Sequence, residues 1–105
     1  MTKAPSGLLA PGRARWRAVH DAYELEPAEP ALLLAACRTV DELDRLTTEL
    51  ATAPLTVVGS TGQPRANPLL AEVRQHRSTL AVLLAQLEVP VDEVLPVRRR
   101  QRGVR

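Results

Sequence analysis

The chain has 105 residues, a formal net charge of +2, a single cysteine and no phenylalanine. Its length favours one domain, because two independent hydrophobic cores require more chain. With one tryptophan and one tyrosine, the core must consist mainly of Leu, Val and Ala, a composition typical of paired helices. One cysteine excludes an intrachain disulfide. Because the sequence contains neither a bilayer-spanning apolar run nor a signal-peptide core, we expect a soluble, cytoplasmic protein.

The charges are segregated along the chain, with basic ends and an acidic middle. Residues 1–23 carry four basic side chains and one acid, residues 24–54 carry seven acids and two arginines, and residues 98–105 carry five arginines and no acid. Such basic segments attract phosphate backbones through counterion release. The candidate DNA-binding residues are Arg13, Arg15, Arg17, Arg98, Arg99, Arg100 and Arg102. Two alternatives stay open: the tail only solubilises the protein, and the N-terminal arginines pair with the acidic middle.

A short helix is the first element expected in chain order. Residues 1–11 are rich in Pro, Gly, Ser and Ala and are predicted to form a flexible leader. Over residues 13–23, Trp16, Val19 and Tyr23 recur at helical spacing, which predicts a short amphipathic helix with an arginine flank.

Two long helices joined by a small hairpin follow. The periodic apolar stripe of residues 27–51 predicts a helix, which Pro54 ends. Residues 55–66 place β-prone side chains before a Gly-x-x-Gly turn and predict a β-hairpin. Asn67 then caps a second long helix over residues 68–88.

The expected fold class is therefore mainly α, with a short N-terminal helix and two long antiparallel helices joined by a small β-hairpin. The helical core, which we also expect to be the oligomerisation domain, spans residues 12–89, between the leader and a flexible tail over residues 90–105 that is basic from Arg98.

No catalytic or metal-binding pattern is recognisable in the sequence, and we expect neither an enzyme nor a cofactor. Gly59-Ser60-Thr61-Gly62 resembles a phosphate loop or a nucleic-acid clamp only superficially, and we interpret it as a hairpin turn. His76, Cys37 and Trp16 lie on apolar stripes and are interpreted as packing residues.

Several leucines lie off the stripes that join the two long helices. A pair of helices cannot cover all of them, and self-association would bury such surface. The candidate oligomer-interface residues are Leu32, Leu34, Leu70 and Leu84. Alternatively, these are scattered exposed leucines, which are common on monomeric proteins.

One family resemblance covers residues 13–88, most of the chain. Its specific part is the hairpin with its helix-opening proline, TVVGSTGQPRANPLL, over residues 56–70. It is accompanied by Trp16, Tyr23-Glu24-Leu25, Leu33, Ala36-Cys37-Arg38, Leu43-Asp44-Arg45 and Glu72-Val73-Arg74. In this order of motifs the chain resembles the phage terminase small subunits of actinobacterial phages and prophages.

The resemblance implies a non-enzymatic component of a viral genome-packaging motor in the cytoplasm of the bacterial host. Such a subunit assembles as a ring, recognises viral DNA, and recruits and regulates the terminase large subunit, which carries the ATPase and nuclease. Residues 89–97 are a candidate docking segment for that large subunit or, alternatively, a plain linker. The alternative function is a helical adaptor or regulatory protein that acts by protein–protein contact and does not bind DNA.

Overall fold

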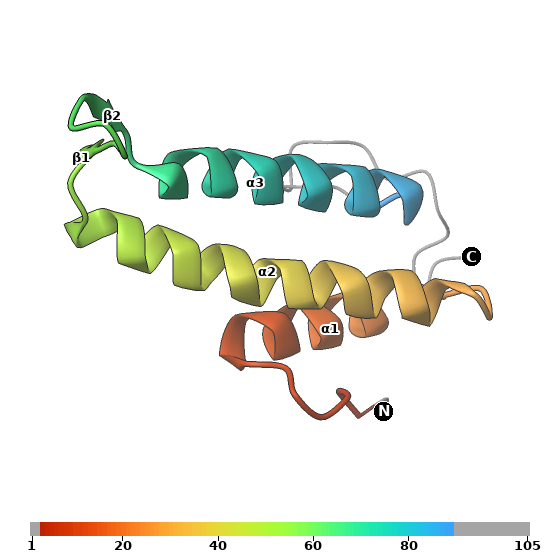
Figure 1. The fold of residues 1–105 in the computed structure, drawn as a ribbon. Helices are drawn as coiled ribbons and strands as arrows, with labels where there is room; N and C mark the ends of the chain where they lie inside the picture. The colour runs from red at the N-terminus through yellow and green to blue at the C-terminus, as the bar shows by residue number, and fades with distance from the viewer. Residues whose placement is uncertain (1–2, 90–105) are drawn as a thin grey trace.

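The structure, a computed structural model, describes residues 3–89 of the chain. Three helices and one hairpin follow in the order α1 (Ala10–Ala22), α2 (Glu29–Thr52), β1 (Thr56–Val58), β2 (Pro64–Ala66) and α3 (Pro68–Gln86). α2 lies between the other two helices and runs antiparallel to both (Figure 1). The predicted mainly α fold is confirmed.

The core lies where all three helices meet, along the first half of α2. Its largest fully buried side chains are Leu33 and Cys37 from α2, and Leu84 and Leu87 at the end of α3. α1 and the residues beside it contribute Leu8, Trp16, Val19 and Tyr23 to the same cluster. Trp16 and Cys37 are thus packing residues, as predicted.

The expected leader is shorter than the sequence indicated. Leu8 is buried in the core, Ala4 packs against the core, and α1 already begins at Ala10 with Pro11 in its first turn. A proline favours the first helical turn because its fixed φ suits the helix and its missing N–H would find no partner there. The flexible leader predicted to reach residue 11 is therefore wrong from Leu8 onward.

The hairpin connects α2 to α3 and lies beyond their ends (Figure 1). Its two strands are antiparallel, with Thr56 opposite Ala66, Val57 opposite Arg65 and Val58 opposite Pro64. Gly62 has a φ of 87° in the turn, a conformation that glycine adopts without steric strain. The turn therefore lies where the sequence predicted it, and the positive φ at Gly62 explains why glycine is needed there.

Asn67 links the hairpin to α3 in two ways. Its side-chain oxygen accepts a hydrogen bond from the Leu69 N–H at 3.0 Å, which caps the helix. Its side-chain amide donates to the Pro54 carbonyl at 2.8 Å, which ties the cap to the end of α2. The predicted cap is confirmed, and it also closes the base of the hairpin.

α3 ends earlier than its sequence pattern suggested. The N–H of Glu88 donates to the Ala85 carbonyl, and the N–H of Val89 donates to the Leu84 carbonyl, both at 3.0 Å. Together with a φ of 57° at Glu88, this is a Schellman motif, in which a left-handed residue satisfies the last carbonyls of a helix. The helix therefore stops at Gln86 through its own capping and not at Pro90.

The half of the α2–α3 pair next to the hairpin is only two helices thick. We call it the distal half and define it as residues 42–52 of α2 and 68–80 of α3. Val73 is its only buried apolar side chain. The half-buried leucines of this region are Leu43, Leu46, Leu50, Leu69, Leu70 and Leu80. α1 does not extend over this region, so the seam between α2 and α3 stays partly open.

Within residues 3–89, no helix combines the length and the apolar character that a membrane span requires.

Candidate functional site

Two of the three N-terminal arginines lie on one exposed face of α1. Arg13 and Arg17 are one helical turn apart and exposed, whereas Arg15, two residues from each, lies on another side and is half-buried. The Nη1 of Arg13 donates to the Leu8 carbonyl at 2.6 Å, which holds its guanidinium near the start of the helix. The structure therefore brings together Arg13 and Arg17 and separates Arg15 from them.

Asp41 fixes the start of α1 from a distant part of the chain. Leu9, the N-cap residue of α1, has no side-chain oxygen with which to cap the helix. The buried Asp41 of α2 takes over this role, because its two carboxylate oxygens accept hydrogen bonds from the N–H groups of Leu9 and Gly12, each at 2.7 Å. A carboxylate at a helix N-terminus satisfies free N–H groups and complements the helix dipole. Asp41 thereby holds the arginine-bearing helix on α2.

Gly12 makes this contact possible. A Cβ atom at this position would lie 2.5 Å from Oδ2 of Asp41 and 2.8 Å from the Cys37 carbonyl oxygen. Any larger residue would therefore push α1 away from α2. The sequence does not reveal this pair, because Gly12 and Asp41 lie 29 positions apart.

Cys37 lies under the same end of α1. Burial raises the pKa of its thiol from 9.0 to about 11, while the nearby Arg15 lowers it and Asp41 raises it further. The thiol is fully buried and protonated at neutral pH, which makes it a poor nucleophile.

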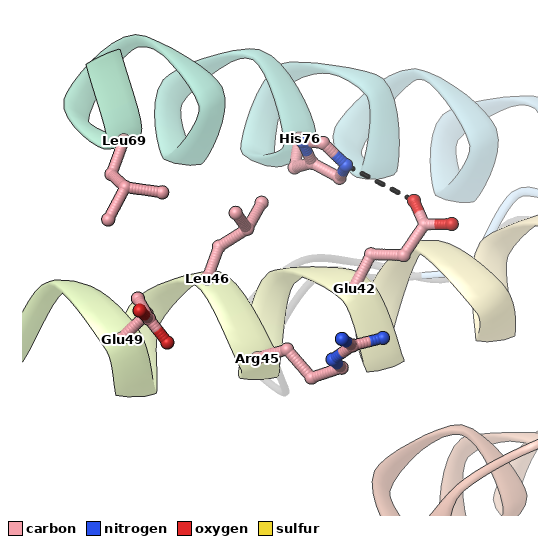
Figure 2. A pocket seen from close by; sticks show the side chains of 6 residues that line it. All are labelled: Glu42, Arg45, Leu46, Glu49, Leu69 and His76. Carbon is pink, nitrogen blue, oxygen red and sulfur yellow. Dashed lines mark hydrogen bonds and ion pairs between the residues drawn. The ribbon is translucent and has the colours of Figure 1, made fainter.

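A groove opens between α2 and α3 in the distal half. It has a volume of 390 Å³ and is lined by Glu42, Arg45, Leu46, Glu49, Leu69 and His76. Leu46 and Leu69 extend toward each other from the two helices and form its apolar floor (Figure 2). Glu42 and Glu49 are exposed on its α2 side. We call this the α2–α3 groove; it combines an apolar floor with a carboxylate rim.

His76 joins the two helices at one end of the groove. Its Nδ1 lies 2.8 Å from the Glu72 carbonyl oxygen of its own helix, and its Nε2 lies 3.1 Å from Oε1 of Glu42 on α2 (Figure 2). Because both facing oxygens are acceptors, only a ring with hydrogen on both nitrogens donates to both at once. His76 is thus a half-buried, hydrogen-bonded packing residue between the two helices, as the sequence predicted.

The Gly-x-x-Gly turn is occupied by its own hydrogen bonds. The N–H of Gly59 donates to the Gln63 carbonyl, that of Gly62 to the Gly59 carbonyl, and that of Thr61 to Oε1 of Gln63. The hydroxyl of Thr61 donates to the same Gln63 oxygen. A phosphate loop needs its N–H groups free to face the ligand. The interpretation as a hairpin turn agrees with this geometry.

The four candidate interface leucines have different environments. Leu32 and Leu34 are half-buried and pack against the core, and Leu70 is half-buried in the distal half. Leu84 is fully buried in the core of the single chain and offers no surface to a second copy. This burial is not evident from the sequence, because it arises where one turn of α3 packs into the cluster shared with α1 and α2. The candidate residues Arg98, Arg99, Arg100 and Arg102 lie outside the described residues.

Among residues 3–89, no three side chains of His, Cys, Asp or Glu come together in a way that could hold a metal ion. Comparison of the chain with family models, with curated proteins and with solved structures found no match.

Proposed function

We propose that this chain is a terminase small subunit: an oligomeric component of a viral genome-packaging motor that binds viral DNA and recruits the large ATPase/nuclease subunit. It acts without catalysing a reaction, in the cytoplasm of a bacterial host. The order of motifs in the sequence supports this family, and two features of the fold fit such a role.

The distal half of the α2–α3 pair is the observation that carries the proposal. Its leucines stay half-buried because no third helix covers the seam there. A helical pair with an open apolar seam is stabilised when copies of the chain cover it. In this proposal, self-association covers the distal half, which lies next to the hairpin that carries the most specific part of the resemblance.

α1 supports the DNA-binding part of the proposal. Arg13 and Arg17 are exposed on one face, and Asp41 fixes the helix that carries them. Because the backbone of α1 is already ordered, its guanidinium groups can contact phosphates without the further cost of ordering the chain. In this proposal the basic tail from Arg98 provides further phosphate contacts.

A salt titration of DNA binding tests this assignment. The affinity of the full-length chain for a short fluorescent duplex is measured by anisotropy over a range of salt concentrations. We expect the R13Q/R17Q variant to bind more weakly at low salt. The slope of log affinity against log salt should fall in magnitude by about 2, as the loss of two phosphate contacts predicts.

The K3Q/R38Q variant is the matched control, because it removes the same charge from exposed positions outside α1 and outside the distal half. We expect its salt slope to stay close to that of the natural chain. Equal losses in both variants would contradict a specific role of α1. A natural chain without measurable DNA affinity would favour the adaptor function instead.

The tail has its own variant, in which Arg98, Arg99, Arg100 and Arg102 are replaced by Gln. We expect this variant to bind all duplex sequences more weakly and with a flatter salt dependence. An unchanged slope would remove the tail from the DNA-binding account.

A further inference from the structure

The described chain carries two exposed surfaces that it does not cover itself. One is the α2–α3 groove with its apolar floor and carboxylate rim. The other is the β-hairpin, which lies beyond the helix ends (Figure 1). Two of the four large apolar side chains that are most exposed belong to this hairpin segment: Leu55 at 65% and Val58 at 78%. Exposed apolar groups that gather on one projecting element are typical of an interaction site.

The hairpin surface is apolar with one positive charge. Val58, Pro64 and Ala66 are all exposed, and the strand register places them on the face opposite Val57 and Arg65. Arg65 is the only charged residue between positions 54 and 67. It is exposed and forms no ion pair within residues 3–89.

The groove has the complementary chemistry. Leu46 and Leu69 provide an apolar floor that side chains such as Val58 and Leu55 could cover. Glu42 and Glu49 place two carboxylates on the rim, against one guanidinium from Arg45. The hairpin therefore complements the groove in two ways: its apolar side chains fit the apolar floor, and its single positive charge is opposite in sign to the carboxylates on the rim.

We propose that the β-hairpin of one copy inserts between α2 and α3 of the next copy, so that both of its faces make contact: Val58 covers the apolar floor of the groove, and Arg65 on the opposite face meets Glu49 on the rim. Because the two surfaces are different, each copy uses its hairpin toward one neighbour and its groove toward the other. Such heterologous contacts are the kind that generate rings. This inference rests on the self-association in the proposed function and adds the surfaces that produce it.

Charge reversal across the contact provides the test, with the solution mass of the full-length chain measured by light scattering. R65E and E49R are each expected to dissociate the assembly, raising its dissociation constant ~10-fold or more, because like charges then face each other. The double variant R65E/E49R is expected to assemble again. An equimolar mixture of the two single variants should also assemble, since each hairpin then finds a groove of opposite charge on the other chain.

An apolar substitution tests the same contact independently of Arg65. V58D is expected to dissociate the assembly, whereas V82D is the matched control. Val82 is 54% exposed on α3 and lies outside the groove, so V82D should leave the mass unchanged. Circular dichroism checks that all variants keep the helical content of the natural chain.

Three outcomes would overturn the inference. The first is an assembled natural chain whose mass is unaffected by R65E and V58D, a result that leaves self-association and the proposed function intact. The second is equal dissociation by V82D and V58D, which would show that the loss is not specific to the hairpin. The third is a monomeric natural chain, which would also remove self-association from the proposed function.

Discussion

At the scale of single residues, Asp41 has the most consequential contacts in the described chain. It is buried, and both of its oxygens accept backbone hydrogen bonds from the first turn of α1. In D41N, one acceptor becomes an NH₂ group that faces a backbone N–H. We expect the free energy of unfolding to fall by about 2–3 kcal/mol in urea titrations, because a buried charge-assisted hydrogen bond is lost and an N–H is left unsatisfied.

D44N is the control for this prediction. Asp44 lies one turn further along α2 and is exposed, so its substitution should change the free energy of unfolding by less than about 0.5 kcal/mol. Equal stabilities of D41N and the natural chain would contradict the tertiary cap.

The second prediction at this scale concerns the thiol of Cys37. Burial raises its pKa from 9.0 to about 11, so the folded chain holds this proton more tightly than the unfolded chain does. The stabilisation is fully present below pH 9 and is lost as the pH rises toward about 11. We expect the free energy of unfolding to fall by roughly 1–2 kcal/mol through this group by about pH 10.5.

Urea titrations at neutral and alkaline pH measure this loss, with C37A as the comparison. Other groups titrate in the same pH range. The informative quantity is therefore the difference between the two chains in the free energy of unfolding lost from neutral to alkaline pH. C37A should lose less stability than the natural chain as the pH rises. Identical alkaline losses would show that Cys37 does not contribute.

At the scale of elements, the end of α3 yields a prediction with an unusual sign. Glu88 adopts a left-handed conformation in the Schellman motif, which strains any residue with a Cβ atom. We expect E88G to raise the free energy of unfolding by about 0.5–1 kcal/mol, although glycine normally destabilises. Q86G, two residues earlier and still helical, should lower it by about the same amount. If E88G and Q86G lowered the free energy of unfolding by the same amount, the result would contradict the capping geometry.

The sequence allowed the elements themselves to be predicted, because their signals are local. Apolar spacing located the long helices, and Gly62, Asn67 and Pro68 located the turn, the cap and the first helical residue. The start of α1 could not be found in this way, since Leu9 is no capping residue. Its cap comes from Asp41, which lies 32 positions away. The apolar periodicity of the sequence does not predict a contact between such distant residues.

The candidate sites were predictable to different degrees for the same reason. The exposed pair Arg13 and Arg17 follows from helical spacing alone, which is a local property. Burial of Leu84 depends on where α1 crosses the long pair, which the sequence pattern does not specify. The α2–α3 groove depends on where the cover of α1 ends, so its lining residues emerged only from the packing of all three helices.

At the scale of the whole molecule, one end is a three-helix core and the other is an open two-helix pair with a projecting hairpin (Figure 1). At the three-helix end, α1 presents Arg13 and Arg17 at the surface. At the open end, the leucines of the distal half are only half-buried. The surface proposed to bind DNA and the surfaces proposed to bind other copies therefore lie on different parts of the molecule. Assembly through the open end would therefore leave Arg13 and Arg17 accessible.

The most direct test of the proposed function is the solution mass of the full-length chain, measured by size exclusion with light scattering at low and high salt. Apolar contacts in the distal half should hold the assembly together when ion pairs are screened. We therefore expect a discrete assembly of several copies whose mass is the same at both salt concentrations. A monomer or a dimer at both salt concentrations would contradict the terminase assignment and favour an adaptor that acts through a single helical face.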